Sequence, residues 1–276
     1  MHMATTAGRL SEQEYRPDVL SGTPRAHVID RWIYVFMAAL FNVIVLTGFV
    51  PDSLRRIASV KAGQRPPFPL VAHVHAVLMG SFLLLLLAQT ALVATGRSHL
   101  HQRLGQMAML LAPALVIAGV ILAPTNYHAV WNAAQSSSPV LRDAMAARFP
   151  GLDNILLGQI RIGILFSLFL AIGIRARGRD PGFHKRMMIL ATATTLTVAI
   201  DRITWLPTTF PGSPLASDLY ILFAVAPLVA WDVFRNRSVH RAYWVWFPIY
   251  LAASVVVNML WDTPWWHATA RQIMNV

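Results

Sequence analysis

The chain has 276 residues, of which 56% are hydrophobic and only 13% are charged. Soluble domains carry about 25% charged residues, so the composition excludes an ordinary water-soluble protein. The absence of cysteine excludes disulfides, thiolate metal sites and cysteine nucleophiles. The net charge of +11 does not indicate nucleic-acid binding, because the basic residues separate apolar runs and do not cluster on one solvated face.

The beginning of the chain is polar and mixed in charge, and it contains no short apolar core followed by a cleavage site. We therefore expect no cleaved signal peptide, and we interpret residues 1–29 as a cytoplasmic tail. Residues 30–262 are expected to form the membrane domain. Residues 263–276 are expected to form a short tail in the periplasm.

Seven apolar windows are long enough to cross a bilayer, whose hydrocarbon core of about 30 Å takes about 20 residues of helix. Short connections join most of them, which favours packing of neighbouring helices against each other. The sequence therefore predicts an all-α polytopic membrane bundle of seven transmembrane helices, arranged as one helix followed by three hairpins. The windows comprise residues 32–50, 70–95, 104–123, 155–174, 187–206, 215–234 and 243–261.

The basic residues predict the orientation of these helices. With the N-terminus in the cytoplasm, the inner side receives the larger share of the 23 lysines and arginines, as the positive-inside rule requires. We therefore expect a multi-pass protein of the inner (cytoplasmic) membrane. Its expected partners are the lipid bilayer and anionic lipids at the inner face, and its oligomeric state stays open.

The three expected inner turns share a pattern in which an arginine is followed by a histidine and a further basic residue. They comprise residues 96–103, 178–186 and 237–241. His101 and His184 each begin an outward-going helix, where free backbone N–H groups favour anions. With Arg103 and Arg186 beside them, they are candidates to hold lipid phosphates, a phosphorylated ligand or haem propionates. The alternative is that these charges only enforce the topology and contact lipid.

Two of these turns carry a resemblance to known proteins. Arg97-x3-His101-x-Arg103 and the segment 183–192 (FHKRMMILAT) resemble motifs of uncharacterised bacterial multi-pass inner-membrane proteins. The resemblance runs from about residue 70 to the end of the chain and implies no particular reaction.

A more distant likeness is to the four-helix membrane core of the cytochrome b type, in which histidines on alternate helices coordinate b-type haem. This likeness implies His101 and His184 as axial ligands of one haem b, with Arg103 and Arg186 holding its propionates. The fourth window offers Gln159 and no histidine, so no second haem is expected. The implied function is electron transfer, and the implied observation is bound pigment.

Ionisable residues at membrane depth point to a second site. His75, Arg161, Asp201 and Asp218 lie at similar depths near the outer ends of their windows. Because charges are expensive in lipid, such residues are functional candidates by default. They predict an outward-facing pocket of a proton-linked transporter or small-ligand sensor, in which Arg161 supplies a fixed positive charge. The alternative is that Arg161 is simply neutralised by Asp201 or Asp218 to satisfy helix packing.

A structural or assembly role is the third interpretation, in which all these polar groups only satisfy one another. At the inner end, Asp232 is expected to pair with a basic inner turn. The sequence contains no Gly-x-Ser-x-Gly elbow, His-Glu-x-x-His zinc motif, phosphate-binding glycine loop or dinucleotide fingerprint. These motifs are not required of intramembrane enzymes, so the sequence leaves enzymatic activity open.

Overall fold

The computed structural model describes residues 28–276, and within this range it is helical with no strand. The cytoplasmic tail expected from the sequence lies outside the described residues, except for its last two positions. The helices are α1 (Val28–Lys61), α2 (Leu70–Ala94), α3 (Ser98–Gln135), α4 (Pro139–Ala146), α5 (Phe149–Ala176), α6 (Pro181–Ala193), α7 (Thr197–Ile200), α8 (Leu215–Asn236), α9 (Arg241–Leu260) and α10 (Pro264–Met274).

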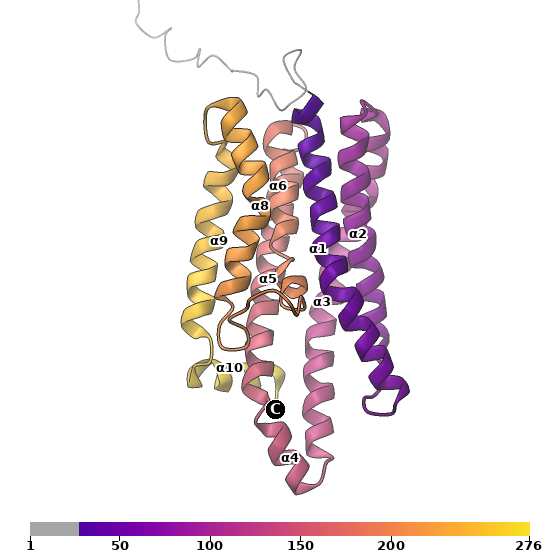
Figure 1. Cartoon of the computed structure of the whole chain (residues 1–276), viewed down its shortest axis with the longest axis vertical. Helices are drawn as coiled ribbons and strands as arrows, with labels where there is room; N and C mark the ends of the chain where they lie inside the picture. Colours follow the sequence, from indigo (N-terminus) through magenta and orange to yellow (C-terminus); the bar gives the residue numbers. More distant parts are fainter. Residues whose placement is uncertain (1–27) are drawn as a thin grey trace, which may run out of the picture.

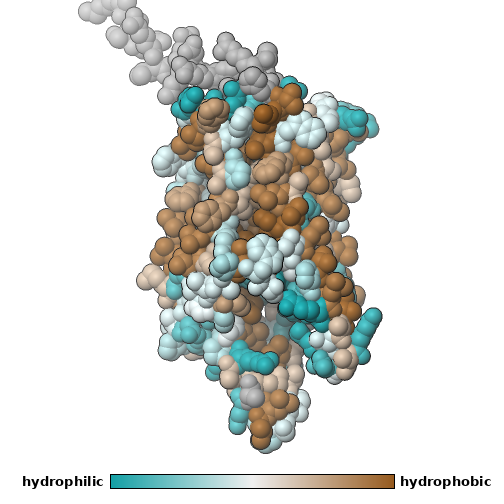
Figure 2. All heavy atoms as spheres, viewed as in Figure 1, coloured by the Kyte–Doolittle hydropathy of each residue, from teal (hydrophilic) through white to brown (hydrophobic). Residues whose placement is uncertain are grey.

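Six of these helices are long and apolar enough to cross a membrane: α1, α2, α3, α5, α8 and α9. Each covers one of the predicted windows to within one residue, so six predicted spans are confirmed and the chain is a multi-pass membrane protein. Hydrophobic residues dominate the middle of the face shown in Figure 2, and hydrophilic residues gather toward its two ends. This distribution suits a bundle whose apolar sides face lipid.

The window at 187–206 is not a continuous helix, and the count of seven spanning helices is not confirmed. Helix α6 ends at Ala193, and α7 forms a single turn after a three-residue interruption. Within the interruption, backbone N–H groups bond to carbonyls three residues earlier instead of four, a tighter geometry than the α-helix. The Thr194 and Thr195 hydroxyls also donate to the carbonyls of Ala191 and Thr192, at 2.7 and 2.8 Å. Such bonds compete with the helical ladder.

The interrupted segment is the most buried part of the bundle. Helix α6 packs against α5, α9, α1 and α8, and its side chains Met187, Ile189 and Leu190 are completely buried. Irregular backbone at membrane depth is tolerated where protein surrounds it. The position of α6 and α7 inside the bundle therefore explains why the interruption is possible.

The bundle has two distinct ends (Figure 1). Helix α1 begins at what we call the N-terminal end, where the α2–α3, α5–α6 and α8–α9 turns also lie. The opposite C-terminal end carries α4, α10 and the last residue, and α3 and α5 extend there beyond the other helices. Residues 124–154 lie between two predicted windows and contain none, but α3 continues to Gln135 and α4 follows. Helix α4 and the end of α3 contain no apolar window of spanning length, so hydropathy does not predict them.

The last helix, α10, covers the C-terminal end of the bundle. Trp266, Ala270 and Met274 recur at four-residue intervals and are buried in a second apolar cluster with Tyr127 and Leu156. The Thr263 hydroxyl accepts a hydrogen bond from the Trp266 N–H and caps the helix. The short tail expected at 263–276 is therefore a docked helix.

Candidate functional site

A buried ion pair joins α5 to α8 near the C-terminal end of the bundle. The Arg161 Nη1 atom lies 2.8 Å from Asp218 Oδ1 and 2.9 Å from Oδ2. Only 5% of the Arg161 side chain and 6% of the Asp218 side chain are exposed. In such surroundings an ion pair persists only if further hydrogen bonds satisfy its remaining polar atoms.

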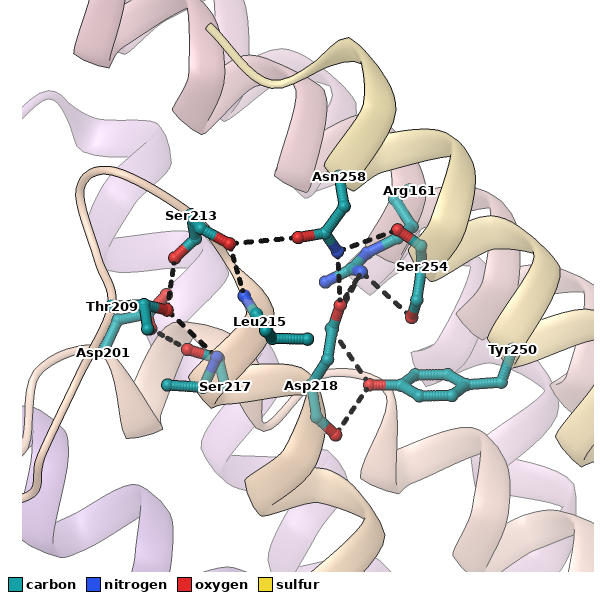
Figure 3. Close-up of polar contacts among 11 residues, drawn as sticks. Arg161, Asp201, Thr209, Ser213, Leu215, Ser217, Asp218, Tyr250, Ser254 and Asn258 are labelled. Carbon is teal, nitrogen blue, oxygen red and sulfur yellow. Dashed lines mark hydrogen bonds and ion pairs between the residues drawn. The ribbon is translucent and has the colours of Figure 1, made fainter.

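Helix α9 supplies those further bonds from one polar stripe (Figure 3). The Tyr250 hydroxyl donates to Asp218 Oδ1 at 3.1 Å, and Asn258 Nδ2 donates to Oδ2 at 3.4 Å. The Ser254 hydroxyl accepts from Arg161 Nη1 at 3.4 Å. Sequence analysis missed these three residues, although their four-residue spacing on an otherwise apolar helix was a usable signal.

Arg161 keeps hydrogen-bonding capacity that the protein does not use. All hydrogen bonds from the Arg161 side chain to the described residues come from Nη1. Its Nε and Nη2 atoms bond to none of the described residues. A guanidinium has five N–H donors in a fixed planar arrangement. The buried pair therefore retains donors for a carboxylate, phosphate or carbonyl oxygen.

A groove between α8 and α9 has a volume of about 420 Å³ and reaches this centre at Asp218, whereas Arg161 itself is not among its lining residues. Asp218, Tyr250, Ser254 and Asn258 give the groove a polar region. Its other walls are apolar, and several of them belong to side chains on the outer surface of the bundle. The apolar walls are formed by Leu215, Leu219, Leu222, Phe247, Leu251, Val255 and Met259.

Of the other two residues of the predicted outer pocket, Asp201 lies beside the ion pair and His75 does not. Asp201 accepts a hydrogen bond from Ser217, the neighbour of Asp218, and so lies beside the ion pair. The ring of His75 instead lies against Gly119 of α3, and its buried Nδ1 has no hydrogen-bond partner among the described residues. The structure thus brings three of the four residues together and records no contact between them and His75.

A second buried ion pair lies near the N-terminal end of the bundle. Arg186 of α6 binds both carboxylate oxygens of Asp232 of α8, through Nε at 2.5 Å and Nη2 at 2.7 Å. Its Nη1 donates to the carbonyl of Gly182 at 2.7 Å. Tyr243 and Asn236 also donate to Asp232, and both charged side chains are completely buried. The predicted pairing of Asp232 with one of the three basic turns is confirmed, and the turn is the one at 178–186.

The two candidate haem ligands lie near the same end, on α3 and α6. The His184 Nδ1 atom lies 2.8 Å from the carbonyl oxygen of Gly173. The buried Nδ1 of His101 has no hydrogen-bond partner in the described part of the chain. Of the two candidate propionate partners, Arg103 is exposed. Arg186 is buried and has a protein partner at each of its three nitrogens.

A polar cluster that sequence reasoning missed holds α10 in place. The completely buried Asp153 accepts from the Tyr127 hydroxyl at 2.6 Å and lies 3.1 Å from His267 Nδ1. The other ring nitrogen of His267 lies 3.2 Å from Asp262 Oδ1. More than a hundred residues separate Asp153 from His267, so no local pattern could connect them.

No group of three or more histidine, cysteine, aspartate or glutamate side chains suited to a metal ion is found within residues 28–276. No family model, curated protein or solved structure matches this chain significantly.

Proposed function

We propose that this membrane protein transports or senses a small amphipathic anion that binds at Arg161. The observation that carries the proposal is a buried guanidinium with unused donors, whose partner Asp218 lines a groove with otherwise largely apolar walls. A ligand with a carboxylate and a short hydrocarbon chain matches both features. Its carboxylate would accept from Arg161, and its chain would lie along α8 and α9.

Charge balance supports coupling of this ligand to a proton. The Arg161–Asp218 pair is neutral, so an added anion would leave one net negative charge in a buried site. Uncompensated buried charge is strongly unfavourable. Uptake of one proton together with the anion would restore neutrality. The proposed ligand therefore binds together with a proton.

Binding of radiolabelled dodecanoate to the purified protein in nanodiscs tests the proposal, with dodecanol as the neutral analogue of equal chain length. The wild type is expected to prefer dodecanoate. Arg161→Leu is expected to weaken its binding by about tenfold to a hundredfold, since a hydrogen bond to a charged group contributes about 1.5–3 kcal/mol. Arg148→Leu, at the exposed start of the same helix, is the matched control.

Arg161→Leu leaves Asp218 without its partner, so the double variant R161L/D218L is the second test. Removing both charges together avoids an unpaired buried carboxylate. We expect this variant to fold and not to bind dodecanoate. Wild-type affinity in the folded double variant, or equal wild-type affinity for dodecanoate and dodecanol, would overturn the proposal.

A second candidate function is electron transfer through haem b coordinated by His101 and His184. The contact of His184 Nδ1 with the Gly173 carbonyl favours it, because metal-ligating histidines usually donate their other ring N–H to such an acceptor. The unpaired nitrogen of His101 also suits a ligand role. Haem would supply one-electron chemistry. Arg186 does not fit the propionate role, which leaves Arg103.

Optical spectra of the protein expressed with ample haem test this candidate, before and after reduction with dithionite. A Soret band and reduced α and β bands are expected in the wild type. His101→Ala and His184→Ala should lose them, and His99→Ala, at an exposed neighbouring position, should keep them. A colourless, folded wild-type protein would reject haem and leave the Arg161 proposal intact.

A further inference from the structure

Three arginines share one carboxylate where α1 meets the segment after α7. Arg202 Nε lies 3.3 Å from Asp52 Oδ2. The same aspartate pairs with Arg56 at 2.6 Å and with Arg55 at 3.7 Å. Asp201 is the other acidic residue that faces Arg202, and its side chain bonds to Ser217 of α8. Counting both aspartates, this cluster keeps an excess positive charge.

The Arg202 guanidinium is positioned without being saturated. It lies 4.7 Å from the ring centroid of Phe49, and its Nη1 donates to the Val198 carbonyl. Its Nε is buried and makes no hydrogen bond within the described residues, because the contact with Asp52 lacks hydrogen-bond geometry. The side chain is 27% exposed, so a ligand can reach it.

An apolar pocket of about 420 Å³ lies directly beside this guanidinium. Leu46, Val50 and Pro51 of α1 form one wall, and Ile203 and Trp205 contribute to the other. Leu46 and Val50 also lie on the outer surface of the bundle, where 59% and 48% of each residue is exposed. The pocket is therefore accessible from the lipid side.

Trp205 marks the depth of the pocket. It is 73% exposed, and exposed tryptophans concentrate where the hydrocarbon of a bilayer meets the headgroups. Charged side chains next to an apolar wall at that depth match the two parts of a phospholipid. Guanidinium groups bind phosphate oxygens through charge-assisted hydrogen bonds.

We propose that this pocket is a binding site for one anionic phospholipid. The phosphate lies against Arg202 and Arg56, and an acyl chain lies along Leu46 and Val50. Free phosphate would contact only the arginines. A phospholipid would contact the arginines through its phosphate and the apolar wall through an acyl chain. The site lies toward the opposite end of the bundle from the basic inner turns. It shares no lining residue with the Arg161 groove, although Asp201 lies near both.

Native mass spectrometry tests this site on the full chain purified from vesicles of equal parts phosphatidylglycerol and phosphatidylcholine. The wild type is expected to retain one phosphatidylglycerol. Arg202→Gln should reduce retention about tenfold, the effect of losing one charge-assisted hydrogen bond. Arg142→Gln on α4 removes an exposed arginine outside the pocket and should retain lipid as the wild type does.

A second variant and a competition experiment complete the test. Arg56→Gln, at a partly exposed position, should also lower retention and serves if Arg202→Gln does not fold. Adding millimolar glycerol 3-phosphate should not displace the lipid, because it lacks the acyl chain. Equal retention in the wild type and both folded variants, or displacement by glycerol 3-phosphate, would overturn the proposal.

Discussion

Asp232→Ala is expected to lower the free energy of unfolding by about 3–5 kcal/mol, the usual effect of removing one member of a buried ion pair. The variant would leave the Arg186 guanidinium charged, completely buried and without its carboxylate. It would also remove the acceptor for Tyr243 and Asn236. Unfolding in mixed micelles with increasing sodium dodecyl sulfate, followed by circular dichroism, measures the change.

Two controls separate the ion pair from general sensitivity to substitution. Asp143→Ala changes an exposed aspartate on α4 and should stay within about 0.5 kcal/mol of the wild type. The double variant R186M/D232L replaces both charges by apolar groups and should recover most of the loss. If Asp232→Ala unfolds like Asp143→Ala, the pair does not stabilise the bundle.

Gly48→Ala is expected to destabilise the protein by about 1–3 kcal/mol, the range for overpacking a well-packed site. A Cβ at this position would lie 2.1 Å from the carbonyl oxygen of Ala199 and 2.8 Å from its carbonyl carbon. Both are backbone atoms, so no change of rotamer can relieve the clash. Helix α1 would have to move away from α7.

Gly80→Ala in α2 is the matched control, because nothing lies within 4 Å of a Cβ there. Removing a glycine from a helix interior is neutral or slightly favourable when there is space. The same detergent titration applies to both variants. Equal unfolding midpoints for the two would show that the close approach of α1 and α7 contributes nothing to stability.

Hydropathy was sufficient to predict six spanning helices, because a bilayer imposes length and apolarity on each of them. The same reasoning was insufficient for residues 187–206, which are apolar enough for a span but contain a cluster of threonines. Which threonine hydroxyls bond to the backbone depends on packing inside the bundle. Helices α4 and α10 are too short to span a bilayer, so the required length and apolarity that reveal membrane spans do not apply to them.

The sequence was sufficient to predict the depth of the candidate site's residues in the membrane, but not which of them pair with each other. Counting about 1.5 Å per residue from the span ends placed Arg161, Asp201 and Asp218 at one level. Which aspartate faces Arg161 depends on how α5 and α8 are rotated about their axes, and a single sequence does not contain that information. His75 has the same depth, but its helix position turns it toward Gly119.

Helix α8 carries ion-pair partners near both of its ends, and this fixes its axial register. Asp218 pairs with α5, Asp232 with α6, and Arg235 with Asp30 of α1. Asp218 and Asp232 are about 21 Å apart along the helix, so sliding α8 by one turn would separate every pair at once. Helix α2 contains no aspartate, glutamate, lysine or arginine, and α3 contains only Arg103.

The α2–α3 hairpin therefore keeps its height in the bundle without an ion pair among the described residues, through apolar packing and hydrogen bonds. One of these joins the Tyr127 hydroxyl of α3 to the buried Asp153 of α5. Sliding the hairpin would break this hydrogen bond but would separate no ion pair. Apolar surfaces can shift past each other without exposing unpaired charge, whereas helices joined by buried ion pairs cannot. Any vertical displacement that accompanies ligand binding is expected in this hairpin, with α1, α5, α6 and α8 as the stationary frame.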